Sequence, residues 1–529
     1  MKKFNLIFYS LFYLGYITIY FLPSLLLANS SNVKHWFNKA VLIKSYKQSY
    51  DWLNPWEKRN IKTKIGIGLV VDINNSKKIF LNKKIKNTLY LLTTAEISYD
   101  ATLIEVTRKD VLQPFIAKIH IIDPAINLAL LKIDNLEFWK KLEPVNWSKL
   151  DVLEKNISDN VQTLKIKSAE EWHYQSAKIE QMAVGYRRLL NAWFPHMKIS
   201  GFSRGGQGYP IIKDNKTVGM MLEIKKGEAK VIPTEMILEF LKHSKIKKYK
   251  SLAHRGFNWK KLPQKSTAEY YKIPYQKSGI LISRVLPYGT GSDVLLRGDY
   301  LTKIGQWQIS YEGKINHPKW GVALFDLLFL DILKVGETIE LNLIRNGEPI
   351  NLMTEVSSFE DIGRLVPLEK IGDRPRYIIN GGFLFQELSL NYLQMWGKNW
   401  DSRAPMRLRL FLENKRSLNT FLKSKKDTKN KSIKKNFNSR IVLVTKVIPD
   451  EINIGYQKIS NAIVLKINNK EIDSLEDVDK AFLDPDGIFH RIDFLPGSHR
   501  LSAILPVKIL NESNQRIQNN FSIPNLKSL

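Results

Sequence analysis

Histidine and cysteine are the residues whose spacing most often reveals a metal site or a thiol-based active site. The chain has 529 residues, with nine histidines and no cysteine. The histidines show neither the His-x-x-x-His nor the His-Glu-x-x-His spacing with which a helix presents zinc ligands. The sequence therefore predicts no metal and no cofactor, and it excludes disulfides and a cysteine nucleophile.

The chain is strongly basic, with 81 Lys and Arg against 51 Asp and Glu and a net charge of +30. Such an excess can attract nucleic acid or an anionic membrane surface. Lys, Asn and Ile are enriched together, which is typical of an AT-rich coding sequence. No interleaved Arg and aromatic pattern of the kind that stacks on bases is present. We therefore expect no nucleic-acid partner, while an anionic membrane surface stays open as a partner.

The first 28 residues have the composition of an export signal. Lys2 and Lys3 precede an apolar run over residues 4–27. This run is also long enough to span a bilayer, so an uncleaved anchor is the alternative. Either reading places the remainder of the chain outside the cytoplasm, and we expect it in the periplasm.

The elements that follow are mostly short strands. Apolar runs separated by polar turns predict strands at residues 65–71, 90–93, 103–107, 115–121 and 128–133. A hairpin is predicted at residues 211–224 with its turn at Asn215, and a helix at residues 234–243 with Thr234 as its N-cap. Many short strands and one closing helix indicate a β-barrel or sandwich domain over residues 33–250.

Two smaller αβ units follow, and the second repeats the outline of the first. The unit at residues 256–357 has predicted strands at 279–285, 300–304 and 338–345, and a helix at 324–333. The unit at residues 438–510 has strands at 441–447 and 462–468, and a helix at 475–482. An aromatic-rich segment (373–415) and a flexible loop rich in Lys, Asn and Ser (416–437) separate the two units.

Several stretches resemble the HtrA (Do-like, Deg) serine proteases. In the first domain they are residues 66–71, 91–97, 123–131 and 205–210, in the order and spacing of that family. Residues 297–299, 324–328, 335–338, 344–347 and 376–393 resemble the branch of the family with a long second PDZ region. The resemblance covers nearly all of residues 60–505. It implies a mainly β chain, with a chymotrypsin-like double β-barrel followed by two PDZ-like α+β domains, and a trimer or larger homo-oligomer.

The resemblance also assigns the three triad positions. The histidine, aspartate and serine positions of the family fall on Glu96, Asn127 and Gln207. A Gln side chain is an amide and cannot attack a peptide carbonyl, and Asn127 cannot stabilise an imidazolium. Gly205 and Gly208 remain from the oxyanion loop, with the bulky Tyr209 beside the space where an oxyanion would form. We therefore predict a pseudoprotease with no catalytic residues.

A PDZ module binds an extended peptide by adding it as a strand beside one of its own strands. In the first unit we predict the terminal-carboxylate loop at residues 277–280, including Ser278, Gly279 and Ile280, and the pairing strand at residues 281–284, including Leu281 and Ile282. The groove wall is predicted to include Phe325 and Leu328. In the second unit residues 438–441 take the loop position and contain no glycine, so we expect weaker binding there.

Three functions fit these observations. The first is an exported pseudoprotease that binds unfolded or C-terminal peptide segments as a chaperone, adaptor or regulator. The second is an active serine endopeptidase with a displaced nucleophile such as Ser203, near His173 and His196 in sequence; it would need a new base and a new oxyanion hole together. The third is a basic surface protein that binds anionic lipid or polysaccharide. We favour the first.

Overall fold

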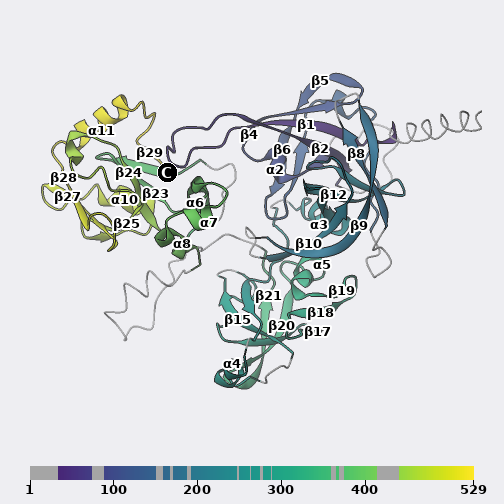
Figure 1. Cartoon of the computed structure of the whole chain (residues 1–529). Coiled ribbons are helices and arrows are strands. Elements are labelled where there is room, and N and C mark those ends of the chain that lie inside the picture. The colour runs from purple at the N-terminus through teal and green to yellow at the C-terminus, as the bar shows by residue number, and fades with distance from the viewer. Residues whose placement is uncertain are drawn as a thin grey trace, which may run out of the picture. The chain divides into compact units, whose positions relative to one another are not determined.

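The computed structural model places most of the chain in two compact units, drawn in Figure 1. The first comprises residues 1–47, 62–285 and 289–359, and the second comprises residues 48–61, 286–288 and 360–529. The structure describes residues 34–73, 88–149, 159–166, 171–187, 192–246, 249–262, 264–273, 278–286, 289–358, 365–367, 374–413 and 440–529. The predicted export signal (1–28) and the predicted flexible loop (416–437) lie outside these residues.

The first half of the protease-like domain is a seven-stranded antiparallel sheet in the order β5-β4-β1-β2-β3-β7-β6. Its strands are β1 (Ala40–Lys47), β2 (Lys62–Asp72), β3 (Leu89–Thr93), β4 (Ala101–Arg108), β5 (Val111–Ile116), β6 (Lys118–Asp123) and β7 (Leu128–Lys132). The predicted single strand at 115–121 is wrong. The chain turns at the buried Ala117, whose N–H donates to the Ile104 carbonyl, so that β5 and β6 form the two ends of the sheet.

The second half is a closed six-stranded barrel in the order β10-β13-β12-β11-β8-β9. Its strands are β8 (Asn160–Ile166), β9 (Trp172–Arg187), β10 (Ala192–Ser200), β11 (Pro210–Lys213), β12 (Lys216–Lys225) and β13 (Glu228–Pro233). The predicted hairpin is confirmed. Asp214 and Asn215 both have positive φ, 48° and 62°, as the two central residues of a type I′ turn require.

Helix α3 (Thr234–His243) closes this domain as predicted, but Thr234 is not its N-cap. The cap position is Pro233, and the buried Thr234 hydroxyl donates to the Thr217 carbonyl at 3.2 Å. Met236, Ile237 and Phe240 point into a core that both barrels share. The helix therefore stabilises the junction of the two barrels.

The first PDZ-like domain has the sheet order β14-β15-β16-β20-β21. These strands are β14 (Phe257–Lys260), β15 (Ile280–Val285), β16 (Tyr300–Ile304), β20 (Thr338–Arg345) and β21 (Glu348–Glu355). The remaining elements are α4 (Lys265–Tyr270), β17 (Trp307–Gln308), the β18 (Lys314–His317) and β19 (Gly321–Leu324) hairpin, and α5 (Leu328–Asp331), preceded by a single 3-10 turn, Phe325–Leu327. The predicted strands at 300–304 and 338–345 are confirmed.

The second unit is built on one sheet in the order β28-β27-β25-β24-β23-β22-β29. Its strands are β22 (Tyr377–Asn380), β23 (Phe383–Glu387), β24 (Val442–Val447), β25 (Ala462–Ile467), β26 (Lys470–Glu471), β27 (Phe489–Phe494), β28 (Ser502–Pro506) and β29 (Lys527–Ser528). Its helices are α6 (Leu390–Leu393), α7 (Trp400–Arg403), α8 (Met406–Glu413), α10 (Leu475–Ala481) and α11 (Leu510–Asn520).

The strand order confirms the predicted repeat. The path β23-β24-β25-β27-β28 matches β14-β15-β16-β20-β21, and a short strand pairs with the third member in both sheets. The segment predicted to separate the two modules (373–415) differs from the prediction in one respect. It supplies β22 and β23, because β23 pairs with β24 across five residues and completes the sheet of the second module.

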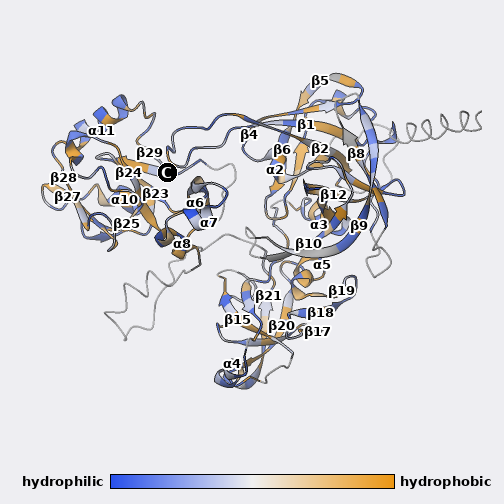
Figure 2. Cartoon of the chain, viewed as in Figure 1, coloured by the Kyte–Doolittle hydropathy of each residue, from blue (hydrophilic) through white to orange (hydrophobic). Residues whose placement is uncertain are grey.

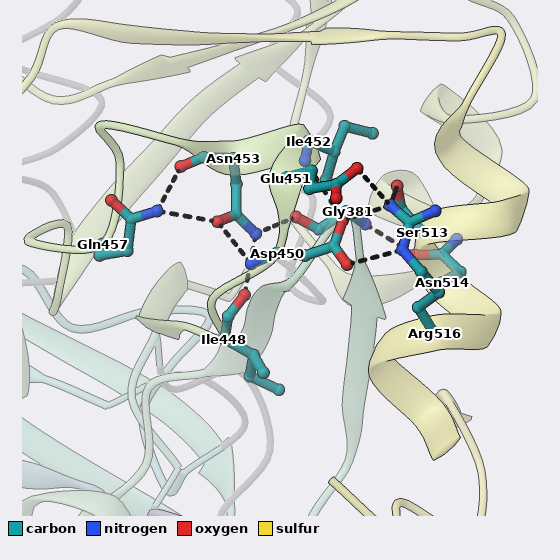
Figure 3. Close-up of polar contacts among 10 residues, drawn as sticks. All are labelled: Gly381, Ile448, Asp450, Glu451, Ile452, Asn453, Gln457, Ser513, Asn514 and Arg516. Atoms are coloured by element: carbon teal, nitrogen blue, oxygen red, sulfur yellow. Dashed lines mark hydrogen bonds and ion pairs between the residues drawn. The ribbon is translucent and has the colours of Figure 1, made fainter. Parts of the chain in front are cut away.

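A buried polar network joins the ends of this sheet to α11 (Figure 3). The fully buried Asn453 donates from Nδ2 to the carbonyls of Gly381 and Ile448, at 2.9 and 2.8 Å. Arg516 of α11 donates to Asp450 at 2.9 Å, and Asn514 accepts the Gly381 N–H at 2.8 Å. The network fixes the glycine turn that leads from β22 into β23.

Hydrophobic residues are concentrated on the strands, whereas α11 is mostly hydrophilic (Figure 2). The two apolar residues of α11, Leu510 and Ile517, are both buried. This pattern is expected of a helix that covers a sheet with one narrow face. No helix in the described part of the chain is long and apolar enough to cross a membrane.

Candidate functional site

The three residues that the resemblance assigns to the triad lie where the seven-stranded sheet meets the six-stranded barrel. Glu96 lies in the short helix α2 (Ala95–Ser98) directly after β3, and Asn127 lies in the turn between β6 and β7. The Glu96 N–H donates to Asn127 Oδ1 at 2.9 Å. Gln207 comes from the loop before β11 and accepts, at Oε1, a 3.2 Å hydrogen bond from the buried Thr94 hydroxyl.

Asn127 is held by the turn that precedes it. Its φ is 60°, a left-handed conformation that Asn adopts more readily than most residues. Asp123, at the end of β6, accepts the Ala125 N–H at 2.9 Å, and the Asn127 N–H donates to the Pro124 carbonyl at 3.3 Å. Asp123 therefore sets the turn that presents the Asn127 amide to Glu96.

The loop that carries Gln207 lies directly against β2. The Ile67 N–H donates to the Gln207 carbonyl at 3.1 Å, and the Gly208 N–H donates to the Met221 carbonyl at 2.9 Å. Gly208 has φ +83°, and a Cβ atom there would lie only 2.0 Å from the Ile67 carbonyl oxygen. Only glycine fits this approach.

The remaining positions of the predicted oxyanion loop are crowded. A Cβ atom on Gly205 would lie 2.7 Å from Met221 Sδ, and one on Gly206 would lie 3.0 Å from the Tyr209 ring. Tyr209 packs against the core shared by the two halves of the domain and against the core of the six-stranded barrel, and burial raises the pKa of its hydroxyl. The Tyr209 ring thus stands beside Gly206, within the loop itself.

Two lysines surround Glu96. Lys64 Nζ lies 3.5 Å from Glu96 Oε1, with both side chains partly exposed. Lys47 Nζ donates to the Glu96 carbonyl at 2.8 Å and lies 3.2 Å from the centre of the Tyr99 ring. In the described part of the chain, no histidine or serine side chain forms a hydrogen bond with the side chains at the three triad positions. The hydrogen bonds of these three side chains go to the Glu96 backbone, to Thr94 and to Lys64, and Lys64 already pairs with Glu96, the single carboxylate among them.

The serine proposed as a displaced nucleophile has other partners. The Ser203 hydroxyl donates to Gln175 Oε1 at 3.1 Å, and His173 Nε2 lies 3.1 Å from Glu171 Oε1. His196 lies on β10, facing Gly185 of β9, so its ring belongs to that hairpin. The Ser203 hydroxyl is thus paired with an amide, which cannot remove its proton.

The predicted peptide-pairing strand of the first PDZ-like domain is wrong. Strand β15 has a partner on each side: Leu281 pairs with Tyr300 of β16 and with Lys260 of β14, and Ile282 pairs with Trp259. Its backbone groups are therefore engaged and cannot accept an added strand. Gly279, in the predicted carboxylate loop with Ser278 and Ile280, packs against the Tyr300 ring, which a Cβ atom would approach to 2.5 Å.

The predicted groove wall is also wrong. Phe325 and Leu328 are fully buried and belong to the core of the domain, with Ile280 and Ile282. The Phe325 ring stacks on the Phe257 ring, with their centres 6.0 Å apart. These side chains stabilise the module and are not available to a ligand.

One edge strand of this sheet is β14, which sequence reasoning missed. It follows Gly256, whose φ is +74° and whose Cβ would lie 2.2 Å from the Thr290 nitrogen. The buried Arg255 donates to the Phe257 carbonyl at 2.6 Å and pairs with Asp326. The Arg-Gly pair at the start of the domain was the signal in the sequence that could have pointed to β14. A glycine that must adopt positive φ before a short strand marks a constrained loop.

The second unit covers the corresponding edge. The strand of the second unit that corresponds to β14 is β23. It also follows glycines, Gly381 and Gly382. Strand β22 pairs with β23 over four residues, and β29 pairs in turn with β22. Residues 438 and 439 of the predicted loop lie outside the described residues.

Comparisons with known proteins agree with this architecture. A PDZ domain model matches residues 366–529. Over 435 residues the chain is 23% identical to protease Do-like 2, chloroplastic, of Arabidopsis thaliana, covering 79% of this chain and 63% of the relative. It is 22% identical over 447 residues to putative protease Do-like 11, mitochondrial, of the same plant, covering 83% and 66%. The matches thus span less than two thirds of either relative.

Two solved structures are also similar. The HtrA-type protease AlgW with decapeptide is 18% identical, with a TM-score of 0.45, covering 63% of this chain and 98% of that protein. The serine endoprotease from Yersinia pestis is 16% identical, with a TM-score of 0.40, covering 63% and 98%.

Two sets of antiparallel strands that meet at a triad-like constellation, followed by PDZ modules, define a trypsin-like fold with PDZ domains. The sequence relatives and the PDZ match support the expected HtrA/Deg (Do-like) family with a PDZ domain. The expected family and fold class are confirmed.

Proposed function

We propose that this protein is an exported HtrA/Deg-like pseudoprotease that binds unfolded or C-terminal peptide segments, as a chaperone, adaptor or regulator. One observation supports the proposal: Glu96, Asn127 and Gln207 stand where the resemblance places the triad, and the Glu96 N–H donates to Asn127 Oδ1 while the Thr94 hydroxyl donates to Gln207 Oε1. The expected export rests on residues 1–28 of the sequence.

The chemistry of these side chains supports inactivity. In working serine proteases, loss of the triad aspartate alone costs about ten-thousand-fold in rate. Loss of the nucleophile or base costs on the order of a million-fold. Here all three positions carry other side chains, and the hydroxyl of Ser203 faces Gln175.

We propose that a peptide adds as a strand along the outer edge of β14, at one end of the sheet. Backbone groups on an open edge can pair with an extended chain, as peptide-binding sheets commonly do. The loop at Gly256 is held rigidly against Thr290, so its conformation is set before a ligand arrives. In the second unit β22 already occupies the equivalent edge, so we propose that this unit takes no peptide in the same way.

The inactivity is tested by casein turnover with the purified protein and a Glu96→His, Asn127→Asp, Gln207→Ser revertant. We expect no turnover by the natural chain. Turnover by the revertant alone would support both the assignment and the inactivity. Turnover by the natural chain, or fluorophosphonate labelling that is lost in Ser203→Ala, would establish the alternative of an active serine endopeptidase.

Peptide binding is tested by amide hydrogen exchange of the natural chain with a peptide that has an apolar carboxyl terminus. We expect protection of residues 256–260 in β14. The other edge of the same sheet, β21, is the internal control and should exchange unchanged. Protection confined to β21 would contradict the assignment. Binding that collapses as salt rises from low to moderate would instead favour an anionic lipid or polysaccharide partner.

A further inference from the structure

Residues 48–61, between β1 and β2, form a compact loop that belongs to the second unit; we call it the arm. The arm has its own internal order. Tyr50 and Lys58 form a β-bridge, and the Asp51 N–H donates to the Glu57 carbonyl at 2.9 Å. The Arg59 N–H donates to the Ser49 carbonyl at 2.9 Å. A loop closed by its own hydrogen bonds loses little entropy when it binds a surface.

The arm docks through Trp56. Its ring lies 6.0 Å from the Tyr377 ring in an edge-to-face arrangement, and Lys446 Nζ lies 5.1 Å from the Trp56 ring centre. Lys446 also donates to the Asn54 side chain, and Arg59 contacts Met395 Sδ at 3.0 Å. Trp56 packs on a small core of the second unit that comprises Tyr377, Ile379, Leu384, Ile448, Ile517 and Ile523.

Charge adds to this contact. Lys446 is partly buried, which lowers its pKa, and the carboxylates of Glu57 and Asp51 oppose that change by favouring its charged form. Arg374 interacts with the Tyr50 hydroxyl, which raises the pKa of Arg374. Acidic and phenolic groups of the arm thus face basic groups of the second unit around a central indole, a pattern typical of specific recognition.

The two ends of the arm lead to Glu96. The arm begins after Lys47, which pairs with Lys62 in the ladder between β1 and β2. Lys47 donates to the Glu96 carbonyl at 2.8 Å, and Lys64 lies 3.5 Å from the Glu96 carboxylate. The strands that hold the arm therefore also hold helix α2.

We propose that the face of the second unit around Tyr377, Arg374 and Lys446 is a binding site for a loop that places carboxylates beside an indole, and that the arm is its resident ligand. A peptide with carboxylates beside a tryptophan competes for this site. Displacement of the arm loosens the ends of β1 and β2 and, through Lys47 and Lys64, the surroundings of Glu96. This site is separate from the peptide edge proposed at β14.

The first test uses the natural chain and zero-length carbodiimide cross-linking with mass spectrometry. We expect Lys446 to be joined to Asp51 or Glu57. The ion pair between Lys527 Nζ and Asp479 Oδ2, which lie 2.8 Å apart in the same unit, provides the positive control. The Lys446 cross-link should persist in Trp52→Ala, a matched variant of the same arm, and should fall in Trp56→Ala. A Lys527–Asp479 cross-link without one at Lys446 in the natural chain would overturn the proposal.

The second test measures binding of a fluorescent peptide of residues 48–61 by anisotropy. A tethered ligand competes at an effective concentration of roughly millimolar, so the natural chain and Trp52→Ala should exclude micromolar peptide. Trp56→Ala should bind it at least about ten-fold more tightly, because its own arm no longer fills the site. Adding Tyr377→Ala to the Trp56→Ala variant should abolish this gain in affinity for the peptide. Equal binding to the natural chain and to a folded Trp56→Ala variant would refute the site, and unchanged amide exchange of α2 in that variant would refute the coupling to Glu96.

Discussion

Replacement of Asp123 by asparagine should loosen the turn that carries Asn127. The Asp123 side chain is 2% exposed. Its Oδ2 accepts the hydroxyls of Tyr249 and Ser251, at 2.5 and 2.7 Å, and its Oδ1 accepts the Ala125 N–H at 2.9 Å. An amide can keep only one of its two ends as an acceptor. Two charge-assisted hydrogen bonds are therefore lost or inverted, each worth about 1.5–3 kcal/mol, and we expect a loss of about 3 kcal/mol.

The assay must report locally because a chain of several domains does not unfold in one step. Amide exchange of β6 and β7 measures the free energy of opening at the turn itself. Tyr249→Phe should cost about 1–2 kcal/mol, since it removes one of the two hydroxyl donors. Asp134→Asn, at an exposed ion pair with Lys118, should leave the exchange of β6 and β7 unchanged. Exchange in Asp123→Asn equal to that of the natural chain would refute the reasoning.

Two further outcomes can be measured. Gly208→Ala should destabilise the protein by about 3 kcal/mol or more, because its Cβ would meet the Ile67 carbonyl; Gly336→Ala, also at positive φ but with nothing within 4 Å, should cost only about 1 kcal/mol in the same denaturant series. In α3, the hydrogen bond to Glu239 raises the pKa of His243, and His243 is the main cause that lowers the pKa of Glu239 to about 2. His243 contributes fully to folding stability below its ordinary pKa, and this contribution is lost as pH rises through the raised pKa. The contribution of Glu239 to folding stability is lost as pH falls toward 2. His243→Gln should therefore lower the melting temperature more at about pH 5.5 than at about pH 8.5, and an equal loss at both would contradict the pairing.

Local signals in the sequence predicted the elements they control. The hairpin at residues 211–224 follows from Asp214 and Asn215, which tolerate the positive φ of a type I′ turn. The repeat of the two PDZ-like modules follows from the same order of apolar runs, at 300–304 and again at 462–467. In each case neighbouring residues determine the structure, so that a single sequence suffices.

Long-range pairing was not predictable in the same way. Strand β15 looks like an edge strand in the sequence, but β14, more than twenty residues earlier, pairs along it. Strands β9 and β10 carry polar residues on the outer face of a closed barrel, so their apolar pattern is weak. The arm gives no periodic signal at all. Its place in the second unit depends on Trp56 meeting Tyr377, more than three hundred residues away.

Asn127 and Gln207 show how local backbone geometry selects side chains at positions that the resemblance assigns to a triad. Position 127 requires a residue that tolerates a φ of 60° and offers an oxygen to the Glu96 N–H, and asparagine meets both needs. Position 207 requires a backbone carbonyl for Ile67 and an acceptor for Thr94, and glutamine meets both. Neither requirement involves a base or a nucleophile. The backbone turns and the glycine at 208 hold the three positions together, so the arrangement of the site does not depend on whether its side chains can react.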